Sequence, residues 1–157
     1  MLEFNINKVS ELINKLTSII PTDNLLEAVI FGSSAITLYD INLERTINDL
    51  DIFVSDTDYE KLKQLTPIEE LKKISKNIEN KTLTLKINGV QHIEILKAFP
   101  GVNHKEVLSK ASLKNHSNTL KVASIEDLVT WKTVQGRPKD VCDLIIINNY
   151  LKSLPTI

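Results

Sequence analysis

The sequence predicts an α/β (α+β) fold in which a mixed, twisted sheet is flanked by helices. Residues 2–20 carry apolar side chains at helical spacing, and the short apolar runs at 25–31 and 47–54 have the length of strands. Asn88-Gly89 lies between two alternating segments, which is a strong hairpin signal. Together these segments predict helices packed on a sheet.

The length of the chain, 157 residues, is typical of one domain, and no repeat or linker interrupts it. We expect one domain over residues 1–157. Its parts would be an N-terminal helix at 2–20, a core at 25–99 and C-terminal helices at 103–151.

The charge and cysteine content narrow the class of protein. The net charge is −1 and the pI about 6.3, so no global positive field would hold long duplex nucleic acid. Cys142 is the single cysteine, which excludes an internal disulfide and suits a reducing compartment. The first residues do not resemble a signal peptide, and no run approaches the roughly 20 apolar residues of a membrane span. We expect a cytoplasmic protein without a membrane partner.

The first two elements follow from apolar spacing and turn residues. The helix at 2–20 has apolar residues at steps of three and four and is followed by Pro21. The run 25–31 meets Gly32, as a strand that ends in a tight turn would. A short helix at 35–39 would then be capped by one of the two serines that follow the glycine.

The middle of the chain predicts a second strand, a helix and a hairpin. The strand is expected at 47–54, and Thr57 with Glu60 forms a capping-box pattern for a helix toward Leu65. The charged segment 67–80 reads as partly helical.

In the hairpin, strands at 81–87 and 90–96 flank the turn. A three-residue loop would place Leu83, Leu85, Ile87, Ile93 and Ile95 on one face and His92 and Glu94 on the other, because a slip of one residue exchanges the faces.

The C-terminal third predicts three helices. Asn103 with Glu106 would cap a short one, and Ser124 with Asp127 a second that continues through Trp131 and Lys132. Gly136 is a natural helix stop, and Pro138 suits the first turn of a last helix that ends near Leu151.

Two carboxylates in the strand at 47–54 predict a metal site. Alternate strand residues share a face, so Asp49 and Asp51 point away from Leu50 and Ile52. Two such groups repel one another unless a cation is present, and Mg²⁺ prefers carboxylate oxygens together with those of a phosphate. Glu94, on the polar face of the hairpin, is the carboxylate that can join them. The alternative is that Asp49 caps a turn and Asp51 faces solvent.

Phosphate-binding groups would surround this pair. The turn at Gly32, Ser33 and Ser34 offers backbone N–H groups and a helix N-terminus, both of which bind phosphate. Lys132 and Arg137 are the best local cations, and Arg137 suits a bidentate phosphate contact. The alternative for Arg137-Pro138-Lys139-Asp140 is a solvated turn between helices.

The order of these motifs resembles the DNA polymerase beta-like nucleotidyltransferase superfamily. That signature is an apolar residue, Gly and Gly or Ser, then Asp-x-Asp and a third acidic residue on a later strand. It matches here Phe31-Gly32-Ser33, Asp49 with Asp51, and Glu94. The tail SIEDLVTWKTVQGRPKD, 124–140, is similar to small bacterial members, including abortive-infection and toxin–antitoxin types. Two departures are the long interval between Ser33 and Asp49 and a glutamate as the third acid.

The resemblance implies a single nucleotidyltransferase-like domain that moves NMP from an NTP to a hydroxyl. Asp49 and Asp51 would ligate two magnesium ions, Glu94 would orient or deprotonate the acceptor, and Ser33 would touch the triphosphate. The acceptor could be an RNA or tRNA end, a protein side chain or a small molecule. A second hypothesis keeps the fold without turnover, as a degenerate nucleotide-binding module that acts as a toxin–antitoxin-type partner. The oligomeric state stays open.

Overall fold

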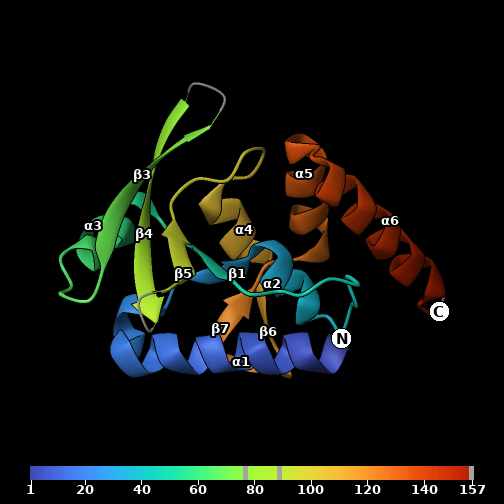
Figure 1. The fold of residues 1–157 in the computed structure, drawn as a ribbon, viewed down its shortest axis with the longest axis horizontal. Coiled ribbons are helices and arrows are strands. Elements are labelled where there is room, and N and C mark those ends of the chain that lie inside the picture. Colours follow the sequence, from blue (N-terminus) through green and yellow to red (C-terminus); the bar gives the residue numbers. More distant parts are fainter. Residues whose placement is uncertain (76–77, 88–89, 156–157) are drawn as a thin grey trace.

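The computed structural model describes residues 1–75, 78–87 and 90–155, with the side chains of 73–79 and 86–91 left aside. Its centre is a mixed seven-stranded sheet in the order β3-β4-β5-β2-β1-β7-β6 (Figure 1). Neighbouring strands are parallel in the pairs β2–β5 and β1–β7 and antiparallel elsewhere. The strands are β1 (Val29–Phe31), β2 (Leu50–Phe53), β3 (Glu69–Ser75), β4 (Ile78–Ile87), β5 (Val90–Leu96), β6 (Ser112–Lys114) and β7 (Ser117–Val122). The mixed α/β sheet expected from the sequence is confirmed.

Six α-helices and a short 3₁₀ helix surround the sheet among the described residues. They are α1 (Leu2–Ile19), η1 (Thr22–Leu25), α2 (Gly32–Thr37), α3 (Asp56–Lys63), α4 (His104–Lys110), α5 (Ile125–Gln135) and α6 (Pro138–Ser153). Figure 1 shows α1 (blue) along one side of the molecule and α6 (red) running outward to the C-terminus. None of the described helices is long and apolar enough to cross a membrane.

The N-terminal helix and the capped helices of the last third are confirmed. The side chains of Asn103 and Ser124 accept hydrogen bonds from the backbone N–H groups of Glu106 and Asp127, which satisfies free donors at the starts of α4 and α5. Gly136 ends α5 with a φ of 59°, a left-handed conformation that glycine adopts at little cost.

Several local predictions are wrong. The strand before Gly32 covers only Val29–Phe31, because a 3₁₀ turn occupies its expected start. The cap of α3 is Ser55, whose side chain accepts from the Asp58 N–H, and not Thr57. The second strand is Leu50–Phe53, so Asp49 lies immediately before it.

Within the charged segment 67–80, expected to be partly helical, the described residues 69–75 and 78–80 form strand. It supplies β3 and the start of β4, and charged side chains are common on an edge strand such as β3 because they discourage pairing with other chains. Strands β6 and β7 have no counterpart among the sequence predictions. Residues 117–122 alternate irregularly between buried and exposed, so they lack the two-residue period that signals a strand.

The predicted faces of the hairpin are correct for its described apolar residues. Leu83 pairs with Ile95 and Leu85 with Ile93, and these four side chains are buried. The expected three-residue loop is wrong, because Ile87 pairs with Val90 and leaves two residues between the strands, and a register shift between Leu85 and Lys86 restores the expected faces. The Asn88-Gly89 turn itself lies outside the described residues.

Both faces of strand β2 are buried at its C-terminal end, at Ile52 and Phe53. Its residues Leu50 and Ile52 lie beside Ile93 and Ile95 of β5, and α1 packs on these two strands. Phe53, on the opposite face with Asp51, is also buried, since its ring packs edge-on against Phe31 and Phe99. The face that carries Asp51 is therefore polar only over a short length and becomes apolar at Phe53.

Candidate active site

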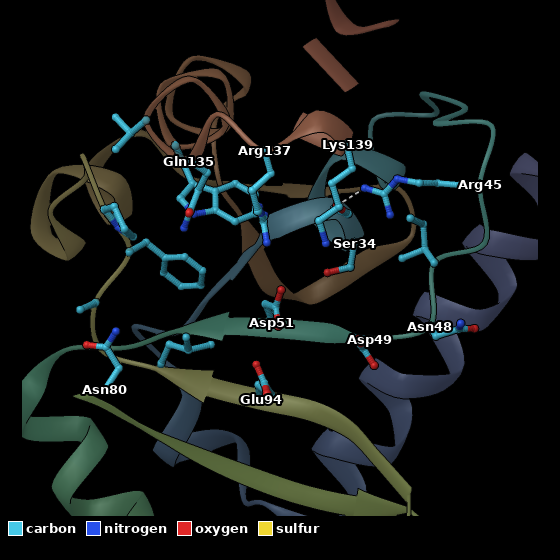
Figure 2. Close-up of a pocket in the computed structure, with 18 of the residues that line it drawn as sticks. Ser34, Arg45, Asn48, Asp49, Asp51, Asn80, Glu94, Gln135, Arg137 and Lys139 are labelled. Carbon is cyan, nitrogen blue, oxygen red and sulfur yellow. Dashed lines mark hydrogen bonds between the residues drawn. The ribbon is translucent and has the colours of Figure 1, made fainter. Parts of the chain in front are cut away.

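Two carboxylates of the site come from adjacent parallel strands. Asp51 of β2 is in direct register with Glu94 of β5, and on its other side it pairs with Phe31 of β1. Figure 2 shows Asp51 and Glu94 next to each other on one wall of a pocket, with Asp49 near the start of β2. Asp51 and Glu94 are half-buried, whereas Asp49 is exposed. The structure thus brings together the three acids that the sequence predicted.

Gly32 approaches this acidic wall so closely that no side chain fits. Its φ is +70°, a backbone conformation that costs other L-residues roughly 1–2 kcal/mol. A Cβ atom built on Gly32 would lie 2.7 Å from Oδ2 of Asp51. The glycine between β1 and α2 therefore allows the backbone of the turn to lie directly beside the Asp51 carboxylate.

The serines after Gly32 also lie in the pocket lining, but neither caps α2. The N-cap of α2 is Phe31 and no side chain bonds there, so the predicted serine cap is wrong. Ser34 is buried, and its Oγ donates a hydrogen bond back to the Phe31 carbonyl at 3.1 Å. Ser33 is half-buried, and its Oγ accepts from Nη2 of Arg45 at 2.8 Å.

The opposite side of the pocket is cationic. Arg137 and Lys139, from the junction of α5 and α6, line it together with Arg45 from the segment before β2 (Figure 2). Since the acids lie on the strands and the cations on the helices and the loop, the pocket separates the two signs of charge. This arrangement suits an anionic ligand whose one edge contacts the cations directly and whose other edge contacts the acids through a bound metal cation.

Lys132 does not line the pocket. Its side chain is fully buried, and its Nζ lies 3.1 Å from Oδ1 of Asp140 and 2.7 Å from Oδ2 of Asp143. Each of these acids holds one of the pocket arginines. Nε of Arg137 lies 2.6 Å from Oδ2 of Asp140, and Nη2 of Arg45 lies 2.6 Å from Oδ2 of Asp143. Lys132 therefore lies at the centre of a buried Asp140–Lys132–Asp143 bridge that positions Arg45 and Arg137.

The ion pairs and neighbouring charges shift the pKa values of Asp140 and Lys139. Burial alone would raise the pKa of Asp140, but hydrogen bonds from Arg137 and Lys132 outweigh it and lower the pKa to about 2. Burial, and then the like charges of Arg137 and Arg45, lower the pKa of Lys139. The three cations Arg45, Arg137 and Lys139 thus share one side of the pocket.

The pocket has a volume of about 550 Å³, within the range of small-molecule sites. The lining has a charged part and an apolar part. The apolar part consists of Leu96, Ala98, Phe99, Pro100, Trp131 and Val134, in which the rings of Phe99 and Trp131 pack edge-on. Two amides, Asn80 and Gln135, also reach the lining. A ligand with a flat apolar part and a charged part would match this division.

The acids fit a magnesium ion that shares its coordination with a ligand. Carboxylate oxygens are donors that Mg²⁺ prefers, but within the described part of the chain no group of three His, Cys, Asp or Glu side chains is close enough to hold a metal by itself. Asp49, Asp51 and Glu94 line one wall, so they could hold magnesium together with phosphate oxygens of a bound nucleotide.

Sequence reasoning missed five polar groups of the lining: Arg45, Thr46, Asn48, Asn80 and Gln135. Arg45 lies in the interval between Ser33 and Asp49, which is longer than in the family signature. The length of that interval was the available signal, because extra residues beside a ligand-binding turn can reach into its pocket.

The sheet, the Gly-Ser turn and the carboxylates on neighbouring strands define a nucleotidyltransferase fold. The chain belongs to the family described as "Nucleotidyltransferase of unknown function (DUF6036)", whose model matches residues 7–152. A search of curated proteins finds no significant match to this sequence.

Solved structures show the same fold. A candidate nucleotidyltransferase (TM1012) from Thermotoga maritima is similar over 92% of this chain and 94% of its own, with a TM-score of 0.57 and 17% identity. The polyadenylate synthase of Megavirus is similar over 96% of this chain but only 36% of its own, with a TM-score of 0.52 and 10% identity.

Proposed function

We propose that this protein, as a single nucleotidyltransferase-like domain over residues 1–157, transfers NMP from a magnesium-bound NTP to a hydroxyl acceptor. One observation carries the proposal: the carboxylates of Asp51 and Glu94 and the turn at Gly32-Ser33 share one pocket with Arg137 and Lys139. Such a pocket offers oxygen ligands for the metal and N–H donors for the phosphates of the same nucleotide. Membership of a nucleotidyltransferase family supports the same chemistry.

The two ends of the pocket favour one orientation of the nucleotide. The base would lie at the apolar end, against Phe99 and Trp131, where the amides of Asn80 and Gln135 can bond its edge. The triphosphate would extend past Asp51 toward the cations. This orientation places the α-phosphate beside the acidic wall and leaves the β- and γ-phosphates to the helix junction.

The transfer would join the acceptor oxygen to the α-phosphorus while the bond from that phosphorus to the β-bridging oxygen breaks. Asp49, Asp51 and Glu94 would hold the magnesium, which when bound stabilises negative charge on the phosphate oxygens. Glu94 would orient the acceptor hydroxyl and take its proton, which then passes to solvent. Arg137 would bind pyrophosphate, the leaving group, with Ser33 at the triphosphate. The products are an NMP ester of the acceptor and pyrophosphate.

Nucleotide binding is the first test. We would measure thermal unfolding with magnesium and each of the four NTPs for wild type and for Asp51→Asn, with Asp23→Asn as a control that removes an exposed acid outside the pocket lining. Ligand at about 100 times its Kd should stabilise the wild type by about 2.7 kcal/mol and raise its midpoint by several degrees. The shift should need magnesium, persist in Asp23→Asn and be lost in Asp51→Asn.

Transfer of α-³²P label from the preferred NTP then tests catalysis, with short RNA, tRNA, protein and aminoglycoside acceptors in separate reactions. Label that appears on one acceptor, and disappears with Asp51→Asn, would support the enzyme. Magnesium-dependent NTP binding without transfer to any acceptor would favour the degenerate module that acts as a toxin–antitoxin-type partner. Absence of binding by all four NTPs would contradict both forms of the proposal.

A further inference from the structure

Arg45 reaches the pocket from a segment of the chain that lies between the two motifs of the family signature. It precedes β2 and is held through three polar contacts of its guanidinium group. Nε and Nη2 bond the two carboxylate oxygens of Asp143, at 3.3 and 2.6 Å, and Nη2 also donates to Ser33 Oγ at 2.8 Å. Arg45 therefore links the phosphate-binding turn to α6, across 98 positions of sequence.

The guanidinium of Arg45 retains donors for a ligand. The two N–H groups of Nη1 donate no hydrogen bond to any residue within the described ranges. The side chain is 33% exposed and lines the pocket, whereas its partner Asp143 is 2% exposed. One edge of the group is thus anchored on a buried acid, and the remaining edge is accessible from the pocket.

The anchor fixes the orientation of Arg45 without neutralising the pocket. Asp143 is shared with Lys132, and Asp140 is shared between Lys132 and Arg137, so three cations meet two carboxylates. This network has a formal charge of +1, and Lys139 adds another. The excess positive charge would be balanced by an anionic group that binds between Arg45 and Lys139.

We propose that Arg45 is a specificity residue that binds the terminal phosphate of the NTP and distinguishes it from an NDP. The inference rests on the proposed function, because it places the nucleotide with its base at the apolar end. In that orientation Arg45 and Ser33 lie at the end of the pocket opposite the base. With Nε and Nη2 bonded to Asp143 and Ser33, Nη1 remains as a charged donor to a phosphate oxygen, and its fixed position is one that the flexible ammonium of a lysine could not reproduce.

The test compares binding of the NTP, NDP and NMP of one base, each with magnesium, by calorimetry. The base is the one whose NTP stabilises the wild type most, and the variants are Arg45→Gln, Arg45→Lys and the control Lys121→Gln, an exposed lysine on β7 outside the pocket lining. Wild type and Lys121→Gln should prefer NTP to NDP. Arg45→Gln should lose about 10- to 100-fold in NTP affinity, as expected for charged hydrogen bonds, with NDP affinity changed less than about twofold.

Circular dichroism shows whether Arg45→Gln folds. If it does not, Arg45→Lys, which keeps the charge beside Asp143, tests whether Arg45 binds the terminal phosphate. It should retain NDP affinity and lose most of the preference for NTP. NTP affinity equal to wild type in the folded variants would overturn the inference, and so would equal losses for NTP and NDP. Either result, combined with loss of transfer in Asp51→Asn, would leave the proposed function in place. Failure of the wild type to bind any NTP would overturn both.

Discussion

The acidic and cationic walls of the pocket are built in different ways. The acidic wall consists of Asp49, Asp51 and Glu94, on or next to adjacent strands, and strand geometry alone brings Asp51 beside Glu94. The cationic wall consists of Arg45, Arg137 and Lys139, and two of these depend on the buried Asp140–Lys132–Asp143 bridge. The comparison shows that one wall is positioned by backbone pairing and the other by tertiary ion pairs. Loss of a single buried side chain should therefore damage the cationic wall much more than the acidic wall.

The largest effect should follow from removal of the charge at the centre of the bridge. Lys132→Met would leave Asp140 and Asp143 buried without their shared cation, which should lower the free energy of unfolding by about 3–5 kcal/mol. Urea denaturation followed by circular dichroism measures this. Lys121→Met, at an exposed position, should change stability by less than about 0.5 kcal/mol. Equal stability of the two variants would show that the buried bridge does not stabilise the fold.

The second-largest effect should come from low pH, because protonation of Asp140 weakens the bridge. The pKa of Asp140 is lowered to about 2, so its contribution is complete above the unfolded pKa near 4 and is lost as pH falls through 2. A shift of this size corresponds to about 2 kcal/mol of unfolding free energy. Urea denaturation at a series of pH values from 6 to 2 should show this loss, and Arg137→Gln should begin to lose stability at higher pH. If the pH dependence of Arg137→Gln matches that of wild type, Arg137 does not stabilise the Asp140 carboxylate.

Two glycine variants should lose similar, smaller amounts of stability but differ in label transfer. Gly32→Ala and Gly136→Ala both place a side chain at positive φ, which should cost roughly 1–2 kcal/mol in each. Only the Gly32 variant introduces a close contact, 2.7 Å from Asp51 Oδ2, because the nearest atom at Gly136 is 3.7 Å away. Label transfer should therefore be lost in Gly32→Ala and retained in Gly136→Ala, as a radiolabel assay would show. Activity retained in Gly32→Ala would mean that Asp51 tolerates displacement.

The smallest effect concerns Lys139. Burial and neighbouring cations lower its pKa, so its charged form is disfavoured in the folded state, and removal of the charge should stabilise the protein slightly. Lys139→Gln should raise the free energy of unfolding by less than about 0.5 kcal/mol while it weakens NTP binding, as charges kept for function often reduce stability. Denaturation and calorimetry on the same sample measure both quantities. A loss of stability would indicate that Lys139 supports the fold instead.

Part of the acidic wall follows from local sequence patterns. The alternation of strand residues assigns Asp51 and Glu94 to polar faces, and the structure pairs them directly, whereas Asp49 lies just before the strand. The caps of α4 and α5 were likewise predictable, since each depends on a side chain and an N–H three residues apart. Such interactions lie within one turn or one strand pair.

The cationic wall could be predicted only in part. Arg137 was correctly assigned to the pocket lining, but Lys132, expected beside it, is buried one layer behind the pocket. Whether a lysine in a helix faces a ligand or a buried acid depends on which helix packs against it. The role of the segment that carries Arg45 depends on contacts with α6, far away in the sequence.

The sequence by itself determined the strand–turn–helix–strand order around Gly32 and the strand face that carries Asp51 and Glu94. These features depend on the two-residue period of strands and on local turn geometry. Only the tertiary structure decided that Arg45 enters the pocket, that Lys132 is buried behind it and that Phe53 packs against Phe31 and Phe99. The physical reason is that burial and ion pairing depend on neighbours brought together by the packing of distant segments, and this packing has no period along the chain.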